Sequence, residues 1–156
     1  MNEASLTALF TLLSGFFSSS ETGMMSLNRY RLKHMAKTGH RGARRAQSLL
    51  QRTDQLIGVI LIGNNFVNIF ASAIATVIAM RLWGDAGIAI ATVALTIVIL
   101  IFAEVTPKTL AALFPEKIAF PASYVLGPLL KILYPVVWAV NLFTTLILRL
   151  LRVSTE

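Results

Sequence analysis

An uninterrupted apolar run in the middle of the chain leads to a carboxylate and then to a proline. Residues 86–103, eighteen in all, contain no charged side chain, Glu104 follows them, and Pro107 comes three positions later. A run of this length is sufficient for a helix that crosses a membrane. The sequence therefore predicts a membrane helix here, and the charge at its end needs a physical reason, because ionisable groups inside a membrane are costly and usually functional.

The composition of the whole chain agrees with an all-α integral membrane protein. Of the 156 residues, 56% are apolar and only 13% are charged, which is far from the makeup of a soluble domain. A chain of this length accommodates three or four spans in a single transmembrane domain, expected over residues 1–153 with residues 154–156 as a tail. There is no cysteine, so disulfides, thiolate metal sites and thiol catalysis are excluded.

We expect three transmembrane helices, over residues 4–25, 56–80 and 86–105. The first lacks the basic leader and the cleavage site of a signal peptide, so it is expected to be retained. Residues 114–151 are also apolar but contain four prolines, which predicts proline-broken juxtamembrane helices that lie in the membrane interface or re-enter the membrane from the cytoplasmic side. A fourth crossing is the alternative, although it would place Arg149 and Arg152 outside the cell.

A basic segment separates the first two expected spans. Residues 28–53 hold eight of the fourteen lysines and arginines and no acidic residue. We interpret the segment as one or two short amphipathic helices, divided near residues 39–42, on the cytoplasmic side of an inner membrane, beside anionic lipids, with the N-terminus outside. It carries no recognisable nucleic-acid-binding motif, so no nucleic acid is expected as a partner.

Polar side chains lie within or at the ends of all three expected spans. The second span carries Asn64, Asn65 and Asn68 beside Gly63, and the first ends in a serine-rich stretch that continues into Glu21. One interpretation is a polar cavity. The other is structural: the amides are hydrogen-bonding groups between helices, and the serines and Glu21 belong to a wetted helix end.

The proline after Glu104 adds a backbone feature to these polar groups. Pro107 has no N–H to give to the carbonyl of Ala103, and it is expected to push Thr106 away from α geometry. Hydroxyl, amide, carboxylate and carbonyl groups form an oxygen-only set that favours hard cations such as Mg²⁺, Ca²⁺ or Na⁺. The absence of cysteine and the loop placement of both histidines argue against zinc or copper.

Three blocks in this order, SGFFSSSETGMMSL, IGNNFVN and FAEVTPK, with the basic segment between the first two, resemble the transmembrane domain of the CorC/CNNM family of magnesium transporters. The resemblance covers about residues 6–151. It implies a homodimeric magnesium exporter, coupled to Na⁺, that binds a largely dehydrated Mg²⁺ inside the membrane domain. The ligands it implies are Ser18, Asn64 and Glu104, with backbone carbonyls and a second rank of side chains: Ser19, Ser20, Glu21, Asn65 and Asn68.

The residues that follow Glu104 are also expected to have roles, and Lys108 after the proline resembles the family pattern. Pro107 is expected to be a hinge, and Lys108 either neutralises Glu104 when the ion leaves or extends to the lipid headgroups. Family members are expected to continue into cytosolic paired nucleotide-binding modules, which residues 1–156 do not include. A membrane anchor and dimerisation platform without transport is the alternative function. An enzyme is not expected, since no zinc-protease motif, aspartate pair or serine–base pair occurs in the spans.

Overall fold

The computed structural model describes residues 2–153, and every regular element in this range is helical. The expectation of an all-α chain is confirmed for this range, and the expected tail at 154–156 lies outside the described residues. The elements, in order, are α1 (Glu3–Ser26), α2 (Arg29–Lys37), α3 (Arg41–Leu50), α4 (Thr53–Trp83), the 3₁₀ turn η1 (Gly84–Ala86), α5 (Gly87–Val98), the π-helix η2 (Ile99–Val105), α6 (Thr106–Leu113) and α7 (Pro115–Leu150).

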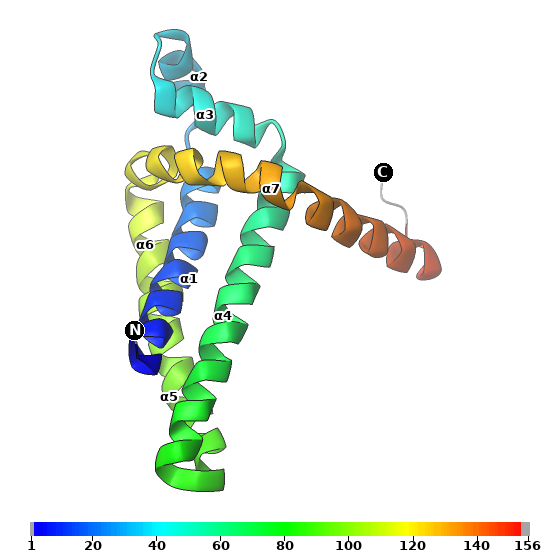
Figure 1. The fold of residues 1–156 in the computed structure, drawn as a ribbon. Coiled ribbons are helices and arrows are strands. Elements are labelled where there is room, and N and C mark those ends of the chain that lie inside the picture. Colours follow the sequence, from blue (N-terminus) through cyan, green and yellow to red (C-terminus); the bar gives the residue numbers. More distant parts are fainter. Residues whose placement is uncertain (1, 154–156) are drawn as a thin grey trace.

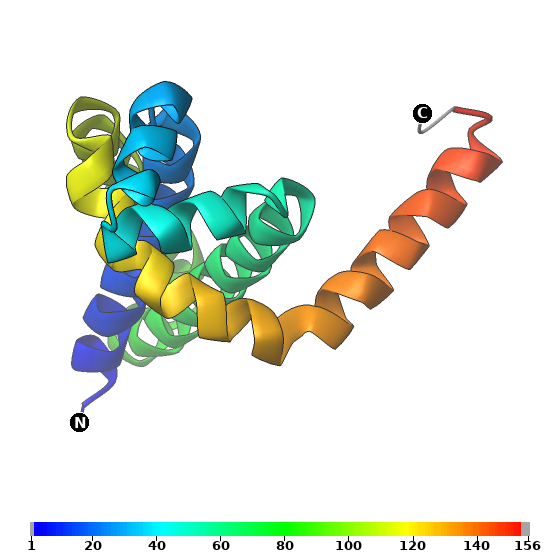
Figure 2. The ribbon, with the colours of Figure 1, turned by 90° about the horizontal axis from the view of Figure 1, so that it is seen from above.

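Three helical columns stand side by side, and the remaining helices gather at one end of them (Figure 1). The columns are α1, α4 and the continuous stack α5–η2–α6. Helix α1 runs antiparallel to α4, because Ser14 donates to Asn64 at 2.8 Å near their middle and Glu3 pairs with Arg81 at 2.7 Å near the far end. Helices α2 and α3 lie beyond the opposite end of the columns, which we call the basic end. Helix α7 lies across this end and extends away to one side (Figures 1 and 2).

The two short basic helices begin at side-chain caps. The side chain of Asn28 accepts from the N–H of Arg31 at 3.2 Å, and Nδ1 of His40 accepts from the N–H of Ala43 at 3.1 Å. Each bond satisfies one of the N–H groups that a helix start leaves without a partner. Between the helices, Gly39 has φ +96°, a conformation that glycine adopts without strain. The expected division of residues 28–53 thus falls at Gly39, and their cytoplasmic location stays a prediction.

The buried core lies at the basic end, whereas large apolar side chains are exposed along the columns. Phe66 on α4, Val93 on α5 and Phe102 on η2 are 62%, 62% and 63% exposed. A soluble monomer rarely exposes apolar surface on this scale, but lipid covers it in a membrane. The core residues at the basic end come from five helices and include Met24, Leu32, Leu49, Leu56 and Leu126.

By length and composition, two helical stretches of the described chain are long and apolar enough to cross a membrane: Thr53–Leu113, which reverses its direction at the turn η1, and Pro115–Leu150. The serine-rich helix α1 does not meet this test, although it runs beside α4, and α7 meets it although it lies across the bundle. The three expected spans therefore stay a prediction. The arrangement in Figure 1 favours α1 over α7 as the third, since α1 is aligned with the other columns.

Two expectations about proline are wrong. Thr106 is α-helical, with φ −65° and ψ −48°, and residues 115–150 form one continuous helix instead of broken pieces. Pro121, Pro128 and Pro135 recur every seventh residue, so they share one face of α7, and all three are exposed. Carbonyls that lose their helical donor on such a face can be hydrated, which is why α7 bends midway (Figure 2) without ending.

Gly63 provides the first prediction, because a Cβ there would overlap with Cζ of Phe17 and lie within 2.9 Å of two further ring atoms. An aromatic ring of α1 therefore packs directly against this glycine. We expect Gly63→Ala to lower the free energy of unfolding by about 1–2 kcal/mol, since overpacking outweighs the better helix propensity of alanine. Thermal unfolding in detergent measures this effect.

The matched control is Gly127→Ala in α7, where no atom lies within 4 Å of the added Cβ. This variant should be as stable as the parent or more stable. Equal melting temperatures for the Gly63 and Gly127 variants would contradict the packing described here.

Candidate cation site between α1, α4 and η2

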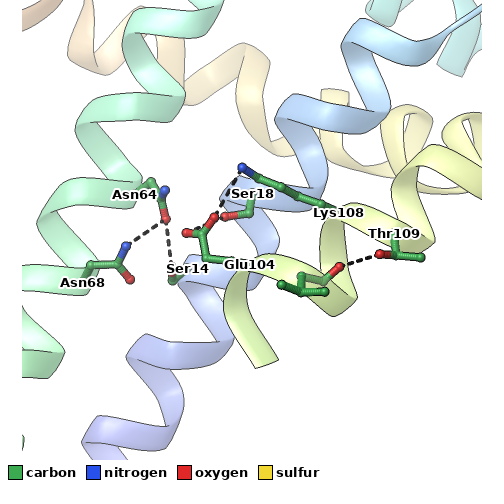
Figure 3. A network of polar contacts seen from close by, with 8 residues as sticks. Ser14, Ser18, Asn64, Asn68, Glu104, Lys108 and Thr109 are labelled. Atoms are coloured by element: carbon green, nitrogen blue, oxygen red, sulfur yellow. Dashed lines mark hydrogen bonds and ion pairs between the residues drawn. The ribbon is translucent and has the colours of Figure 1, made fainter. Parts of the chain in front are cut away.

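A carboxylate, a hydroxyl and an ammonium group meet where η2 passes α1. Ser18 donates to Oε1 of Glu104 at 3.3 Å, and Nζ of Lys108 lies 3.3 Å from Oε2 of the same carboxylate (Figure 3). Ser18 is buried, whereas 27% of the Glu104 side chain and 48% of the Lys108 side chain are exposed. Both carboxylate oxygens therefore have a donor, and one of these donors is itself a cation.

A second group of polar side chains joins α1 to α4. The amide oxygen Oδ1 of Asn64 accepts from Ser14 at 2.8 Å and, at 3.5 Å, from Nδ2 of Asn68. The other amide oxygen, Oδ1 of Asn68, is buried and has no hydrogen-bond partner within the described residues. A buried oxygen without a donor is unfavourable by about 1–3 kcal/mol, so this atom is available for a ligand. In Figure 3 these amides and the Glu104 carboxylate point toward one another between the helices.

The π-helix η2 aims Glu104 at α1. Thr106 donates its N–H to the carbonyl of Ile101, five residues back, which is the π register. If this register continued by one residue, the N–H that Pro107 lacks would go to Phe102, so the carbonyl of Phe102 joins that of Ala103 as a candidate to be left without a donor. The carbonyl oxygen of Phe102 lies 3.3 Å from where a Cβ would be at Gly15. The glycine thus lets α1 approach this backbone closely, and single π turns of this kind are frequent at functional sites.

The structure brings some of the predicted site residues together and leaves others outside this network. Those in the network are Ser18, Asn64, Asn68, Glu104 and Lys108, with Pro107 at its edge against Gly15. The second-rank residues outside it are Ser19, Ser20, Glu21 and Asn65. The two serine hydroxyls donate to the carbonyl of Phe16 in their own helix, Asn65 is exposed, and Glu21 has no ion pair within the described residues. Whether any of these residues binds metal stays a prediction.

Sequence reasoning missed Ser14 as a site residue and also missed a hydroxyl-lined groove. An open groove of about 380 Å³ runs between α4 and α5, with Glu104 and Asn68 among its lining residues. Its hydroxyl groups come from Ser72, Thr76, Thr92 and Thr96. Each donates its hydrogen to the carbonyl four residues before it, which leaves oxygen lone pairs free to face the groove. The four-residue spacing along each helix was the signal in the sequence.

This arrangement can hold a hard cation but differs from a multi-carboxylate metal centre. Among residues 2–153, no group of three or more histidine, cysteine, aspartate or glutamate side chains is placed to bind a metal. The donors that converge are one carboxylate, amide oxygens and serine hydroxyls, all of which are oxygen ligands. Such a set suits Mg²⁺, Ca²⁺ or Na⁺ and offers only one negative charge.

A helical bundle with an apolar exterior and polar side chains between its helices is typical of a membrane domain. The chain belongs to the family described as the Cyclin M transmembrane N-terminal domain (CNNM), whose model matches residues 5–156. This membership confirms the family predicted from the three sequence blocks.

Curated relatives extend the comparison. The chain is 56% identical, over 92% of its length, to the UPF0053 inner membrane protein YfjD of Escherichia coli and 51% identical, over its whole length, to a UPF0053 protein of Haemophilus influenzae. A chloroplastic DUF21 domain-containing protein of Arabidopsis thaliana is 33% identical over 94% of the chain. The chain covers 34%, 39% and 22% of these relatives' own lengths, so it corresponds to one part of longer proteins.

The Ser14–Asn64 bond generates a prediction about the site's own stability. Ser14→Ala removes a buried donor to the amide oxygen of Asn64. We expect the free energy of unfolding, measured thermally without metal, to fall by about 0.6–2 kcal/mol, the range for hydrogen bonds between membrane helices. Thr109→Ala is the control, because its exposed hydroxyl bonds only to the carbonyl of Val105 in the same stretch of helix. An equal loss of stability in both variants would mean that the hydrogen bond between Ser14 and Asn64 contributes nothing to the free energy of unfolding.

Proposed function

We propose that this domain exports Mg²⁺ across the inner membrane in exchange for Na⁺, through a site formed by Ser18, Asn64 and Glu104. The observation that carries the proposal is that two hydrogen-bonded groups, Ser14 with Asn64 and Ser18 with Glu104, lie beside each other between three helices (Figure 3). The single carboxylate supports a transport role over permanent binding, since a site with several acids would hold a divalent cation too tightly to release it. The family resemblance supports Mg²⁺ as the ion and Na⁺ as its counter-ion.

Lys108 takes part in this proposed mechanism as an internal substitute for the ion. Its ammonium group occupies one oxygen of Glu104, at 3.3 Å, so the carboxylate is not left unpaired when no metal is present. An arriving Mg²⁺ would displace Lys108 and take oxygens from Glu104, Ser18 and Asn64, with the unpartnered oxygen of Asn68 close by. Because Mg²⁺ gives up water reluctantly, the ligands must approach octahedral geometry.

The groove between α4 and α5 is the proposed outward path. It begins at Glu104 and continues past Thr96 and Thr92 toward the end of the bundle opposite the basic helices. Hydroxyl oxygens at successive turns offer weak ligands from which an ion can move on. Na⁺ entering from that side would meet the same oxygens and compete for Glu104, and the hinge at Pro107 would allow η2 to move against Gly15.

The proposed topology has three spans, α1, α4 and the α5–η2–α6 stack. The basic helices α2 and α3 lie on the cytoplasmic side and the N-terminus lies outside, in accord with the positive-inside rule. We propose a homodimer in contact with membrane lipids, because the exposed apolar faces of α4 and α5 offer surface for both.

A membrane anchor and dimerisation platform is the second candidate. The contact between Ser14 and Asn64 joins two helices directly, as expected of polar groups that only hold a bundle together. The relatives are also much longer than this chain, so an anchor would have other domains to hold. An anchor should be indifferent to Mg²⁺, and this difference separates the two candidates.

Glu104→Gln tests the charge at the proposed site. Removing a charged ligand is expected to weaken Mg²⁺ binding by about 1.5–3 kcal/mol, so about tenfold to a hundredfold more Mg²⁺ should be needed for the parental rate of efflux. The measurement is efflux from magnesium-loaded vesicles with and without an inward Na⁺ gradient. Glu3→Gln is the control, because this carboxylate pairs with Arg81 outside the network. Parental efflux by folded Glu104→Gln protein would refute the assignment, and absence of efflux and of Mg²⁺-induced stabilisation in the parent would favour the anchor.

Lys108→Gln tests the competition between the lysine and the ion. Without the ammonium group, the Mg²⁺ concentration for half-maximal thermal stabilisation should fall by about two- to fivefold, the equivalent of an ion pair of about 0.5–1 kcal/mol. Lys117→Gln is the control, since this lysine lies over the ring of Phe114 away from the network. An unchanged or higher concentration would mean that Lys108 serves only to reach the headgroups.

A further inference from the structure

An open groove rich in positive charge lies between α3 and α7, at the end of the bundle. Its volume is about 530 Å³. Four cationic side chains line it, from α3, from the turn that follows α3 and from α7: Arg44, Arg45, Arg52 and Lys131. The hydroxyl groups of Ser48, Ser123 and Tyr124 also line it, but no acidic side chain does. This groove lies apart from the network around Glu104 and plays no part in the proposed transport.

Arg45 is held in place at the wall of this groove. Its Nε donates to the hydroxyl of Ser123 at 3.3 Å and its Nη2 to the carbonyl of Phe120 at 3.5 Å, and its guanidinium lies 5.0 Å from the centre of the Tyr124 ring. Ser123 is fully buried. These neutral contacts orient the guanidinium without neutralising it, so its charge is still presented to the groove.

The neighbouring cations are likewise left without acids. The ion pairs of residues 2–153 involve Arg31, Arg81 and Lys108, and none of the four groove cations is among them. Collecting like charges in one groove is unfavourable unless an anion enters it. Guanidinium and ammonium groups beside hydroxyls are the donors that phosphate oxygens accept from most readily.

We propose that this groove binds the phosphate headgroup of an anionic phospholipid. Its position indicates a lipid as the source of the phosphate, because Lys131 is followed on α7 by the exposed apolar residues Ile132, Tyr134 and Trp138. Aromatic side chains of this kind concentrate at the level of the headgroups, and basic pockets between helices bind anionic headgroups there. The headgroup would bridge α3 and α7 and fix α7 across the end of the bundle. This inference depends on the membrane location of the domain and not on the ion it transports.

The test compares lipid-induced thermal stabilisation of purified protein in detergent. The probes are short-chain phosphatidylglycerol, phosphatidylcholine of the same chain length, and inorganic phosphate. The groove variant is Arg52→Gln with Lys131→Gln, and the control is Lys33→Gln with Arg41→Gln, which removes the same charge from exposed positions outside the groove. Each variant is compared with its own melting temperature without lipid, and Lys131→Gln alone is included in case the double variant folds poorly.

We expect phosphatidylglycerol to raise the melting temperature of the parent and the control alike, with phosphatidylcholine and inorganic phosphate giving much smaller shifts. In the groove variant, about tenfold more phosphatidylglycerol should be needed for the same shift, since two charge-assisted contacts are lost. Equal responses of the groove and control variants would overturn the proposal. A shift from inorganic phosphate as large as that from phosphatidylglycerol would also overturn it, because the groove would then serve a soluble anion.

Discussion

The arrangement of the helices around the site depends on the placement of a single carboxylate in an apolar bundle. An ionised side chain at the centre of a membrane helix is unfavourable by about 2.5–3.5 kcal/mol on insertion scales, so Glu104 requires partners. Helix α1 supplies Ser18, and the first turn of α6 supplies Lys108. The π register of η2 turns the carboxylate toward both side chains. Gly15 and Gly63 give α1 the space to lie against η2 and α4, because any side chain at these positions would meet Phe102 and Pro107 or the ring of Phe17. The polar network and the close packing of the three columns therefore depend on each other.

Much of the fold could be predicted because it follows from strong local signals. The uncharged run before Glu104, the basic segment and the short gap between the expected spans 56–80 and 86–105 are signals of this kind, and the family match agrees with them. The predictions that failed were those about proline. Pro107 and the prolines of α7 do not end their helices, since a π turn absorbs the first and the others share an exposed face where freed carbonyls can be hydrated. The presence of a proline does not predict either outcome, because each depends on the surroundings of the backbone.

The candidate site was partly predictable for a similar reason. Polar residues inside apolar segments are conspicuous, which is how Ser18, Asn64 and Glu104 were found. Their partners depend on the rotation of each helix about its axis. Only packing reveals that Ser14 faces Asn64 whereas Asn65 faces outward, and that Lys108 turns back to Glu104. The hydroxyls that line the groove between α4 and α5 have a four-residue spacing in the sequence, but this spacing does not reveal that they face a groove, since such hydroxyls also bond to the backbone of their own helix.

A crystal structure of the protein with Mn²⁺ in place of Mg²⁺ tests the central claim most directly, because the metal can be located by its anomalous scattering. The account predicts a peak between Glu104, Ser18 and Asn64, at distances of about 2.1 Å from their oxygens, with Nζ of Lys108 moved away from the carboxylate. Addition of excess Mg²⁺ should abolish the peak. A peak elsewhere, or an unoccupied site in which Lys108 stays paired with Glu104 at saturating metal, would contradict the account.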